Sequence, residues 1–109
     1  MKGIGIDIVS VSRLSASVAD KILSKKEMVE FKGYMKSDKE RAMNFLGGRL
    51  ASKEAYLKAI GVGIYQGVAL TELSIYKDEN GVPKFKNVPN ALLTLSHDAG
   101  VAVAVVVIL

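Results

Sequence analysis

The chain has 109 residues, half of them hydrophobic, and its 15 Lys and Arg against 11 Asp and Glu give a formal net charge of +4. That length suits a single domain over residues 1–109, and the apolar content excludes a disordered chain. The absence of cysteine excludes disulfides, thiolate nucleophiles and cysteine metal sites. No secretory signal pattern opens the chain, and its longest apolar run, residues 101–109, is far shorter than the roughly 20 residues of a membrane span. We therefore expect a cytoplasmic protein without membrane contact.

The positive charge is concentrated in the first part of the chain. Residues 1–67 carry 12 Lys and Arg against 7 Asp and Glu, whereas residues 68–109 carry 3 against 4. A basic surface of this kind suits an acidic partner or phosphate groups. On charge alone, an ordinary solvated helix surface is the simpler interpretation, because a Lys-rich face needs no partner to be stable.

The N-terminal third predicts a strand followed by helices. Apolar residues alternate over residues 3–9, GIGIDIV, which is strand periodicity, and Asp7 lies on the face opposite the isoleucines. Residues 13–32 look mostly helical. Within them, Ser24 and Glu27 have the spacing of a capping box between two shorter helices.

The middle of the chain predicts one long helix. Ser37 and Glu40 repeat the capping-box spacing, so we expect the helix to begin near residue 38 and to run to residue 60, with Gly61 as its stop. The glycine pair at positions 47 and 48 costs about 1 kcal/mol per glycine relative to alanine. Such a pair indicates a kink or the close approach of another backbone.

The last third is strand-like. Strands are expected over residues 70–77, 82–86, 91–96 and 101–109, with turns at 78–81 and 97–100. The final strand has no polar side chain, so neither face should meet water, and another subunit could cover one face. The predicted class is α+β, a small and mostly antiparallel sheet packed against a long helix and shorter helices.

Two acids are the main candidates for chemistry. Asp7 lies in an apolar strand, where a carboxylate needs a cation or hydrogen-bond donors; backbone amides or an arginine would serve as well as a metal. Glu54 precedes Lys58 by four residues, which also fits a surface ion pair worth ~0.2–0.5 kcal/mol. If both acids entered one cleft, they would repel by about 4 kcal/mol at ~4 Å and an effective dielectric near 20. A divalent cation such as Mg²⁺ would reverse that sign.

Cations and glycines near Glu54 suit phosphate. Arg49, Lys53 and Lys58 step along the predicted helix and could bracket phosphate oxygens. Gly61 and Gly63 would let backbone amides approach a phosphate, although a lone Gly-x-Gly is more often a plain turn.

The only histidine, His97, follows Ser96 at a predicted strand end, where binding residues often lie. A structural histidine with one hydrogen bond is the more frequent case, and a phosphate donor is the alternative. Ser96 is a poor nucleophile candidate because the chain has no elbow motif and no acid–histidine–serine order.

Three blocks of the chain together resemble a known family. They are residues 3–9 with Arg13 behind them, residues 45–63, FLGGRLASKEAYLKAIGVG, and residues 95–97, LSH, followed by the apolar final strand. In order and spacing they resemble the bacterial holo-acyl-carrier-protein synthases, the small 4'-phosphopantetheinyl transferases. The resemblance covers nearly the whole chain except residues 15–40.

The resemblance implies the 4'-phosphopantetheinyl transferase fold and an enzyme of fatty acid biosynthesis. Such enzymes transfer 4'-phosphopantetheine from coenzyme A to a serine of apo acyl carrier protein and release adenosine 3',5'-bisphosphate. By similarity, Asp7 and Glu54 would ligate Mg²⁺, which grips the pyrophosphate of coenzyme A. Lys58 would stabilise developing negative charge, and the proton acceptor would be Glu54 or a metal-bound water.

The resemblance also implies partners. It places contacts to coenzyme A at Arg49, Lys53, Lys58, Gly61, Gly63, Ser96 and His97. Arg13 would meet the acidic helix of the carrier protein, and the chain would form a homotrimer with coenzyme A in the clefts between subunits. The alternatives are a coenzyme A binder without activity and a nucleic-acid-binding module, which would show exposed aromatics or a basic stripe on a sheet face.

Overall fold

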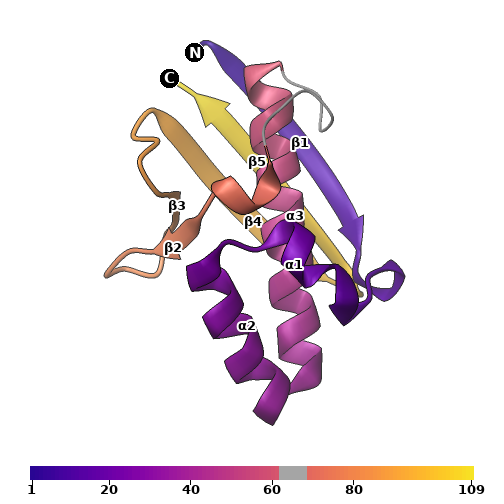
Figure 1. Ribbon diagram of the computed structural model, residues 1–109. Helices are drawn as coiled ribbons and strands as arrows, with labels where there is room; N and C mark the ends of the chain where they lie inside the picture. The colour runs from indigo at the N-terminus through magenta and orange to yellow at the C-terminus, as the bar shows by residue number, and fades with distance from the viewer. Residues whose placement is uncertain (62–68) are drawn as a thin grey trace.

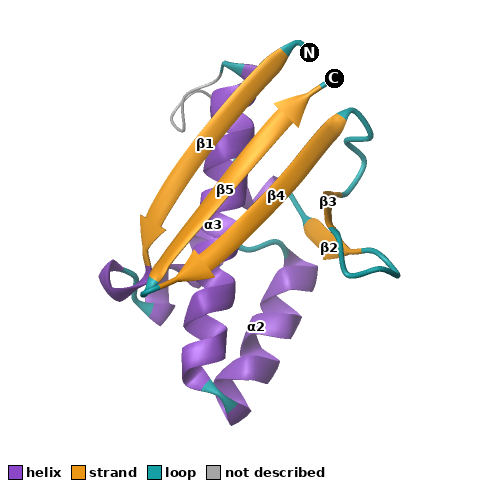
Figure 2. Cartoon of the chain, turned by 180° about the vertical axis from the view of Figure 1, so that it is seen from behind, coloured by secondary structure: helices purple, strands orange, loops and turns teal. Residues whose placement is uncertain are grey.

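The fold is a small antiparallel sheet with one long helix across it. The computed structural model describes residues 1–61 and 69–109. Strands β1 (Gly3–Ser10), β5 (Val101–Ile108) and β4 (Ala91–Asp98) form a sheet in the order β1-β5-β4, and helix α3 (Lys39–Ile60) lies along one face (Figure 1). Seen from behind, no helix or strand of the described chain covers the other face (Figure 2). The predicted α+β class is confirmed.

Smaller elements surround α3. Helix α2 (Lys25–Ser37) packs beside it, and the hairpin of β2 (Ile75–Lys77) and β3 (Pro83–Phe85) lies beyond β4. The short helical turns are η1 (Val11–Arg13), η2 (Ala16–Val18), α1 (Ala19–Ile22) and η3 (Leu70–Glu72). The predicted capping box of α2 is confirmed: the Glu27 amide donates to the Ser24 hydroxyl at 3.3 Å, and the Ser24 amide donates to Glu27 Oε1 at 2.8 Å. No described helix has the length and apolar character needed to cross a membrane.

Helix α3 begins differently from the prediction. Ser37 is the last residue of α2, and Asp38 caps α3 by accepting the Arg41 amide on Oδ1 at 3.1 Å. The predicted box of Ser37 and Glu40 is therefore wrong, because Asp38 adopts the extended backbone of a cap one residue later. The predicted stop is confirmed, since Gly61 ends the helix in the left-handed region with φ 78°.

Glycines allow the helix to pack closely against the sheet. A Cβ on Gly5 would lie 2.0 Å from the Ala55 carbonyl oxygen, so only glycine lets β1 lie so tightly against α3. Asp7, two residues further along the same face of β1, therefore also lies close to the helix. A Cβ on Gly48 would lie 2.9 Å from His97 Nε2, so the glycine pair in α3 marks a close approach in a continuous helix.

The C-terminal elements follow the prediction in part. The strand expected over residues 70–77 is formed only at Ile75–Lys77, because the three residues of η3 make a helical turn first. The predicted turn before β3 is formed, with Asp78 Oδ1 accepting the amides of Asn80 and Val82 at 2.9 Å each. Strand β4 continues to Asp98, which shortens the last turn to residues 99–100, both with positive φ.

The two faces of the sheet differ in burial. On β5, the side chains of Ala102, Ala104, Val106 and Ile108 are buried under α3, whereas the alternate valines are only half-buried. In the single chain the outer face of this strand is half-exposed, so the prediction that neither face meets water depends on a second subunit covering it. The outer face continues onto β1, where Ile4, Ile6 and Ile8 are 59%, 58% and 67% exposed.

Candidate active site

Asp7 and Lys58 meet where β1 lies on α3. The Asp7 side chain is directed at the helix and is buried. Lys58 Nζ donates to Asp7 Oδ1 at 2.9 Å and to the Ile6 carbonyl oxygen at 3.0 Å. Lys58 therefore reaches across to the strand, and the surface ion pair with Glu54 is not among the salt bridges of the described residues.

Glu54 lies beside Asp7, as the resemblance predicted. Burial, followed by a side-chain hydrogen bond to Asp7 and the charge of that residue, raises the pKa of Glu54 from 4.5 to about 7, while Lys58 acts in the opposite sense. The negative charge of Asp7 disfavours ionisation of the Glu54 carboxyl group, because two like charges in one small space repel. The predicted convergence of the two acids is present in this fold.

This acid pair fits a hard divalent cation. Asp7 Oδ2 is buried and has no hydrogen-bond partner among the residues described, so an acceptor is left there for a ligand. Within the same residues, no cluster of three or more His, Cys, Asp or Glu side chains exists. Magnesium suits two carboxylates, since it usually keeps several waters and takes further oxygens from substrate phosphates.

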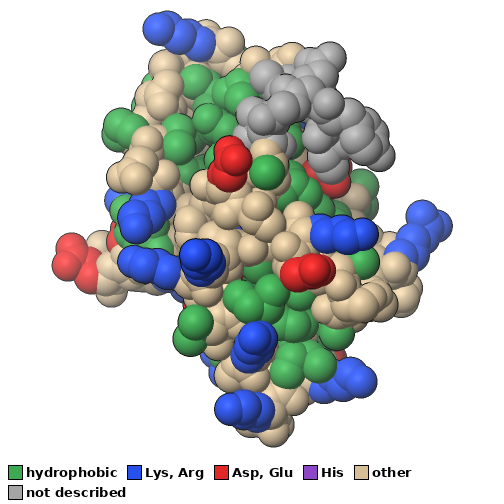
Figure 3. Space-filling view, viewed as in Figure 1, with side chains coloured by type: hydrophobic (Ala, Val, Ile, Leu, Met, Phe, Trp, Pro, Cys, Tyr) green, Lys and Arg blue, Asp and Glu red, His purple; other side chains and the backbone are tan. Residues whose placement is uncertain are grey.

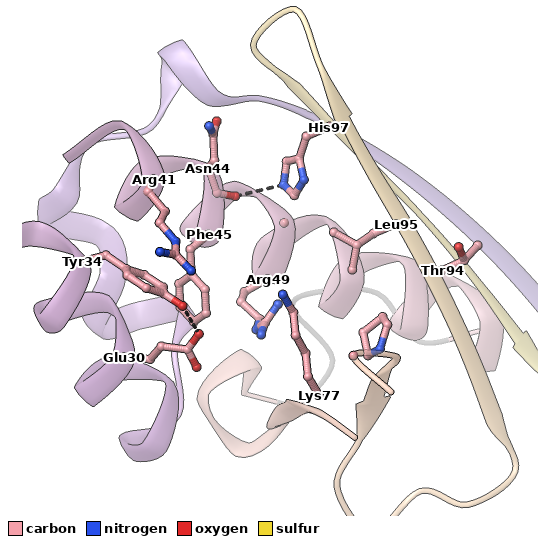
Figure 4. A pocket seen from close by; sticks show the side chains of 13 residues that line it. Glu30, Tyr34, Arg41, Asn44, Phe45, Arg49, Lys77, Thr94, Leu95 and His97 are labelled. Carbon is pink, nitrogen blue, oxygen red and sulfur yellow. Dashed lines mark hydrogen bonds between the residues drawn. The ribbon is translucent and has the colours of Figure 1, made fainter. Parts of the chain in front are cut away.

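A second group of predicted residues lines a cavity of about 380 Å³ on the other flank of α3 (Figure 4). Helix α2, helix α3, the β2–β3 hairpin and β4 form its walls. Its cationic or titratable side chains include Arg41, Arg49, Lys77 and His97. Sequence reasoning missed Arg41 and Lys77. The available signal for Arg41 was its place two turns ahead of Arg49 on the same helix.

Aromatic rings hold both arginines in place. The Arg41 guanidinium lies 4.3 Å from the centre of the Tyr34 ring, and the Arg49 guanidinium lies 4.4 Å from the centre of the Phe45 ring. Arg49 is buried, which lowers its pKa, and the charge of Glu27 opposes that effect. Its Nε lies 3.5 Å from Glu27 Oε2 but makes no hydrogen bond in the described part of the chain. The cavity thus presents a fixed cationic wall.

Lys53 lies elsewhere than predicted. Its side chain is 0% exposed, and Nζ donates to Glu27 Oε1 at 2.5 Å and to the Ile22 carbonyl oxygen at 2.6 Å. Burial lowers the pKa of Lys53, and Glu27 opposes that shift. Lys53 therefore belongs to a buried ion pair between α2 and α3, and the phosphate contact predicted for it is not compatible with this position.

The remaining predicted residues are dispersed. His97 Nε2 donates to the Asn44 carbonyl oxygen at 3.0 Å, and its ring borders the cavity (Figure 4). Ser96 precedes it in β4, so strand alternation directs its side chain to the opposite face. Arg13 is exposed in η1. Gly61 ends α3, and Gly63 lies outside the described residues.

The structure thus separates the predicted residues into two groups. Asp7 is on β1 and His97 is on β4, which are opposite edges of the sheet, with β5 between them and α3 above. Glu54 and Lys58 face the first group, and Arg49 faces the second.

Comparison with known proteins identifies the family. The family model described as 4'-phosphopantetheinyl transferase superfamily matches residues 3–106. A holo-[acyl-carrier-protein] synthase of Staphylococcus aureus (strain Newman) is 36% identical over 88 residues, 75% of this chain and 72% of the relative.

Solved structures agree. A holo-(acyl-carrier-protein) synthase from Bacillus anthracis in complex with CoA (3',5'-ADP) superposes with a TM-score of 0.85 at 34% identity, covering 98% of this chain and 95% of that one. The Helicobacter pylori synthase in complex with coenzyme A gives a TM-score of 0.79 at 33% identity, covering 97% of this chain and 99% of that one. The chain therefore belongs to the 4'-phosphopantetheinyl transferase superfamily and, within it, to the holo-[acyl-carrier-protein] synthases.

Proposed function

We propose that this protein transfers 4'-phosphopantetheine from coenzyme A to a serine of an apo acyl carrier protein, as a step that activates the carrier for fatty acid biosynthesis. The observation that carries the proposal is the meeting of Asp7, Glu54 and Lys58 at one point, from a strand and a helix far apart in the chain. The CoA complexes of the related B. anthracis and H. pylori synthases support the choice of donor.

Asp7 and Glu54 would hold Mg²⁺ through the unpartnered Asp7 Oδ2 and the Glu54 carboxylate. When bound, the metal supplies charge neutralisation for the two phosphates of the donor. The carrier serine oxygen forms a bond to the phosphorus that bears the pantetheine arm, and the bond from that phosphorus to the bridging oxygen breaks. Adenosine 3',5'-bisphosphate leaves with the electron pair.

Two side chains of this protein would stabilise the developing charge and accept the proton. The Lys58 ammonium, exposed at its tip but anchored to Asp7, is placed to stabilise negative charge on the phosphate oxygens. Glu54, once ionised, can accept the proton that leaves the serine hydroxyl.

The cavity on the other flank of α3 would receive the nucleotide phosphates. Arg49 and Arg41 offer guanidinium groups suited to bidentate phosphate contacts, and His97 borders the same space. Two of the 12 cations in residues 1–67, Arg41 and Arg49, belong to this wall. Lysine and arginine side chains are spread over one face of the molecule (Figure 3). The exposed Arg13 would meet an acidic carrier helix.

The uncovered sheet face would join subunits into a homotrimer. Its exposed apolar residues are Ile4, Ile6, Ile8 and Leu92. A contiguous apolar patch on a sheet is typical of an interface. One coenzyme A must reach both the carboxylate pair and the cationic cavity, and these lie at opposite edges of one chain. Adjacent subunits would bring the two groups together in a shared cleft. The outer face of the β1-β5-β4 sheet carries no aromatic side chain, which gives no support to a nucleic-acid stacking surface there.

The test is a transfer assay read by mass spectrometry. Apo carrier protein incubated with the enzyme, coenzyme A and Mg²⁺ should gain one phosphopantetheine group on serine. No gain would refute the function, and a gain of equal size after EDTA treatment would refute the metal assignment. Light scattering on Ile6→Lys should show loss of the trimer together with loss of transfer. A wild-type monomer that transfers at full rate would refute the shared cleft.

A further inference from the structure

We infer that Glu27, buried where α2, α3 and the β2–β3 hairpin join, is a positioning residue that sets the shape of the cationic cavity and through it the affinity for the nucleotide end of the donor. The inference rests on the proposed function only in taking that cavity as the nucleotide site. From the sequence, Glu27 is predicted only to cap helix α2.

A single carboxylate here collects four partners from three elements. Oε1 accepts the Ser24 amide at 2.8 Å and Lys53 Nζ at 2.5 Å. Oε2 accepts the Ile75 amide at 2.9 Å and lies 3.5 Å from Arg49 Nε. Glu27 is 2% exposed, so water does not compete for these contacts.

The same three elements are walls of the cavity. Helix α2 contributes Glu30 and Tyr34, helix α3 contributes Arg49, and the hairpin contributes Lys77 and Pro83 (Figure 4). Glu27 joins them because it lies one turn before Glu30 and bonds β2 two residues before Lys77. The fourth wall, β4, is tied separately to α3 by the hydrogen bond of His97 to the Asn44 carbonyl.

Arg49 is the link from Glu27 to a bound phosphate. Its guanidinium is held on one side by the Glu27 carboxylate and on another by the Phe45 ring. A guanidinium has five N–H donors in one plane, so an anchored edge leaves other donors aimed at the cavity. Because Glu27 also fixes β2, it sets the separation of Arg49 from Lys77 across the cavity.

The negative charge of Glu27 is needed at this position, and a neutral side chain of similar shape cannot replace it. One anion faces two buried cations, Lys53 and Arg49. Removing it leaves Lys53 without an acidic partner among the described residues and leaves Arg49 with only the weaker influence of Glu30. Glutamine would replace one acceptor oxygen by an amide donor, which would face the Lys53 ammonium or the Ile75 amide. The hairpin or the arginine should then shift.

Three variants separate positioning from simple stability. Glu27→Gln removes the charge. The double variant Glu27→Gln with Lys53→Met also removes the uncompensated ammonium and should restore much of the stability. Phe31→Leu, in the apolar core between α2 and α3, is a matched control that loosens the same helix without touching the cavity.

Calorimetric binding of adenosine 3',5'-bisphosphate and steady-state kinetics should be measured at a temperature where urea titration shows each protein folded. We expect Glu27→Gln and the double variant to weaken nucleotide binding and raise KM for coenzyme A by about tenfold, with kcat at saturation changed by less than about threefold. Phe31→Leu should keep the wild-type affinity.

The inference would be overturned if the double variant regained nucleotide affinity together with stability, or if Phe31→Leu lost as much nucleotide affinity as Glu27→Gln. Glu27 would then contribute to the stability of the fold only. If Glu27→Gln fails to fold, the double variant carries the test. If the wild-type protein transfers phosphopantetheine but Glu27→Gln binds adenosine 3',5'-bisphosphate with unaltered affinity, only the inference is refuted. A wild-type protein that neither binds the nucleotide nor transfers refutes the proposed function itself.

Discussion

Replacing Glu54 by glutamine should stabilise the metal-free protein at alkaline pH. The pKa of Glu54 is raised from 4.5 to about 7 by burial and by Asp7, so the folded chain keeps a proton that the unfolded chain loses between those values. The unfolding free energy therefore falls as pH rises through this window and levels off above pH 7. A rise from 4.5 to about 7 corresponds to about 3 kcal/mol in full, and solvent screening of the partly exposed carboxyl reduces this to about 1–2 kcal/mol.

Urea titrations in EDTA at pH 4 and pH 8 measure the effect. At pH 4, below both pKa values, Glu54 is mostly protonated in the folded and the unfolded chain and glutamine resembles it, so the two proteins should unfold together. At pH 8, Glu54→Gln should be more stable by about 1–2 kcal/mol, a midpoint shift on the order of 1 M urea. Glu40→Gln, at an exposed position in the first turn of the same helix, is the control and should show no such difference.

Magnesium provides the opposing measurement. At pH 8, Mg²⁺ should stabilise the wild-type protein and not Glu54→Gln, because binding to folded protein alone adds stability by mass action. The difference between the two proteins should then shrink or reverse. If Glu54→Gln were less stable than wild type at pH 8 in EDTA, the two acids would not repel in the folded state, and the case for a dication between them would fail.

Three further substitutions test separate parts of the structure. Asp7→Asn should abolish transfer in the mass-spectrometric assay while far-ultraviolet circular dichroism stays unchanged, because its ion-pair partner Lys58 is exposed and can return to water. Gly5→Ala should destabilise by about 3 kcal/mol or more in urea titration, since its Cβ would lie 2.0 Å from the Ala55 carbonyl oxygen. Gly33→Ala, where nothing lies within 4 Å on helix α2, should instead stabilise by about 0.5–1 kcal/mol.

Local signals in the sequence were sufficient for much of the fold. Alternation predicted β1, and the spacing of Ser24 and Glu27 predicted the cap of α2, because both depend on residues close in the chain. Residues 70–72 were assigned wrongly to a strand. A three-residue helical turn has no periodicity that could be recognised in advance.

The row of cations on α3 needed tertiary contacts to be understood. Arg49 and Lys53 are four residues apart and share one flank of the helix, and Glu54 and Lys58 share another about 100° away. Helical spacing alone separates these two pairs. It does not show that the first pair faces Glu27, 22 and 26 residues earlier in the chain, or that Lys58 turns toward Asp7. The sequence therefore predicts a ligand contact for Lys53, whereas in the structure Lys53 neutralises the buried Glu27.

The two flanks of α3 carry an excess of opposite charge, and this accounts for the mixture of acidic and basic residues along the helix. On the flank toward β1, two acids exceed the single cation Lys58, so a positive ion is favoured there. On the flank toward α2, the cations Arg41, Arg49, Lys53 and Lys77 outnumber the acids Glu27 and Glu30, so an anion is favoured beside Arg49. Under the proposed function, a ligand that carries a metal-bound diphosphate at one place and a further phosphate at another would satisfy both flanks at once, when a second copy of the chain brings the opposite flank into reach.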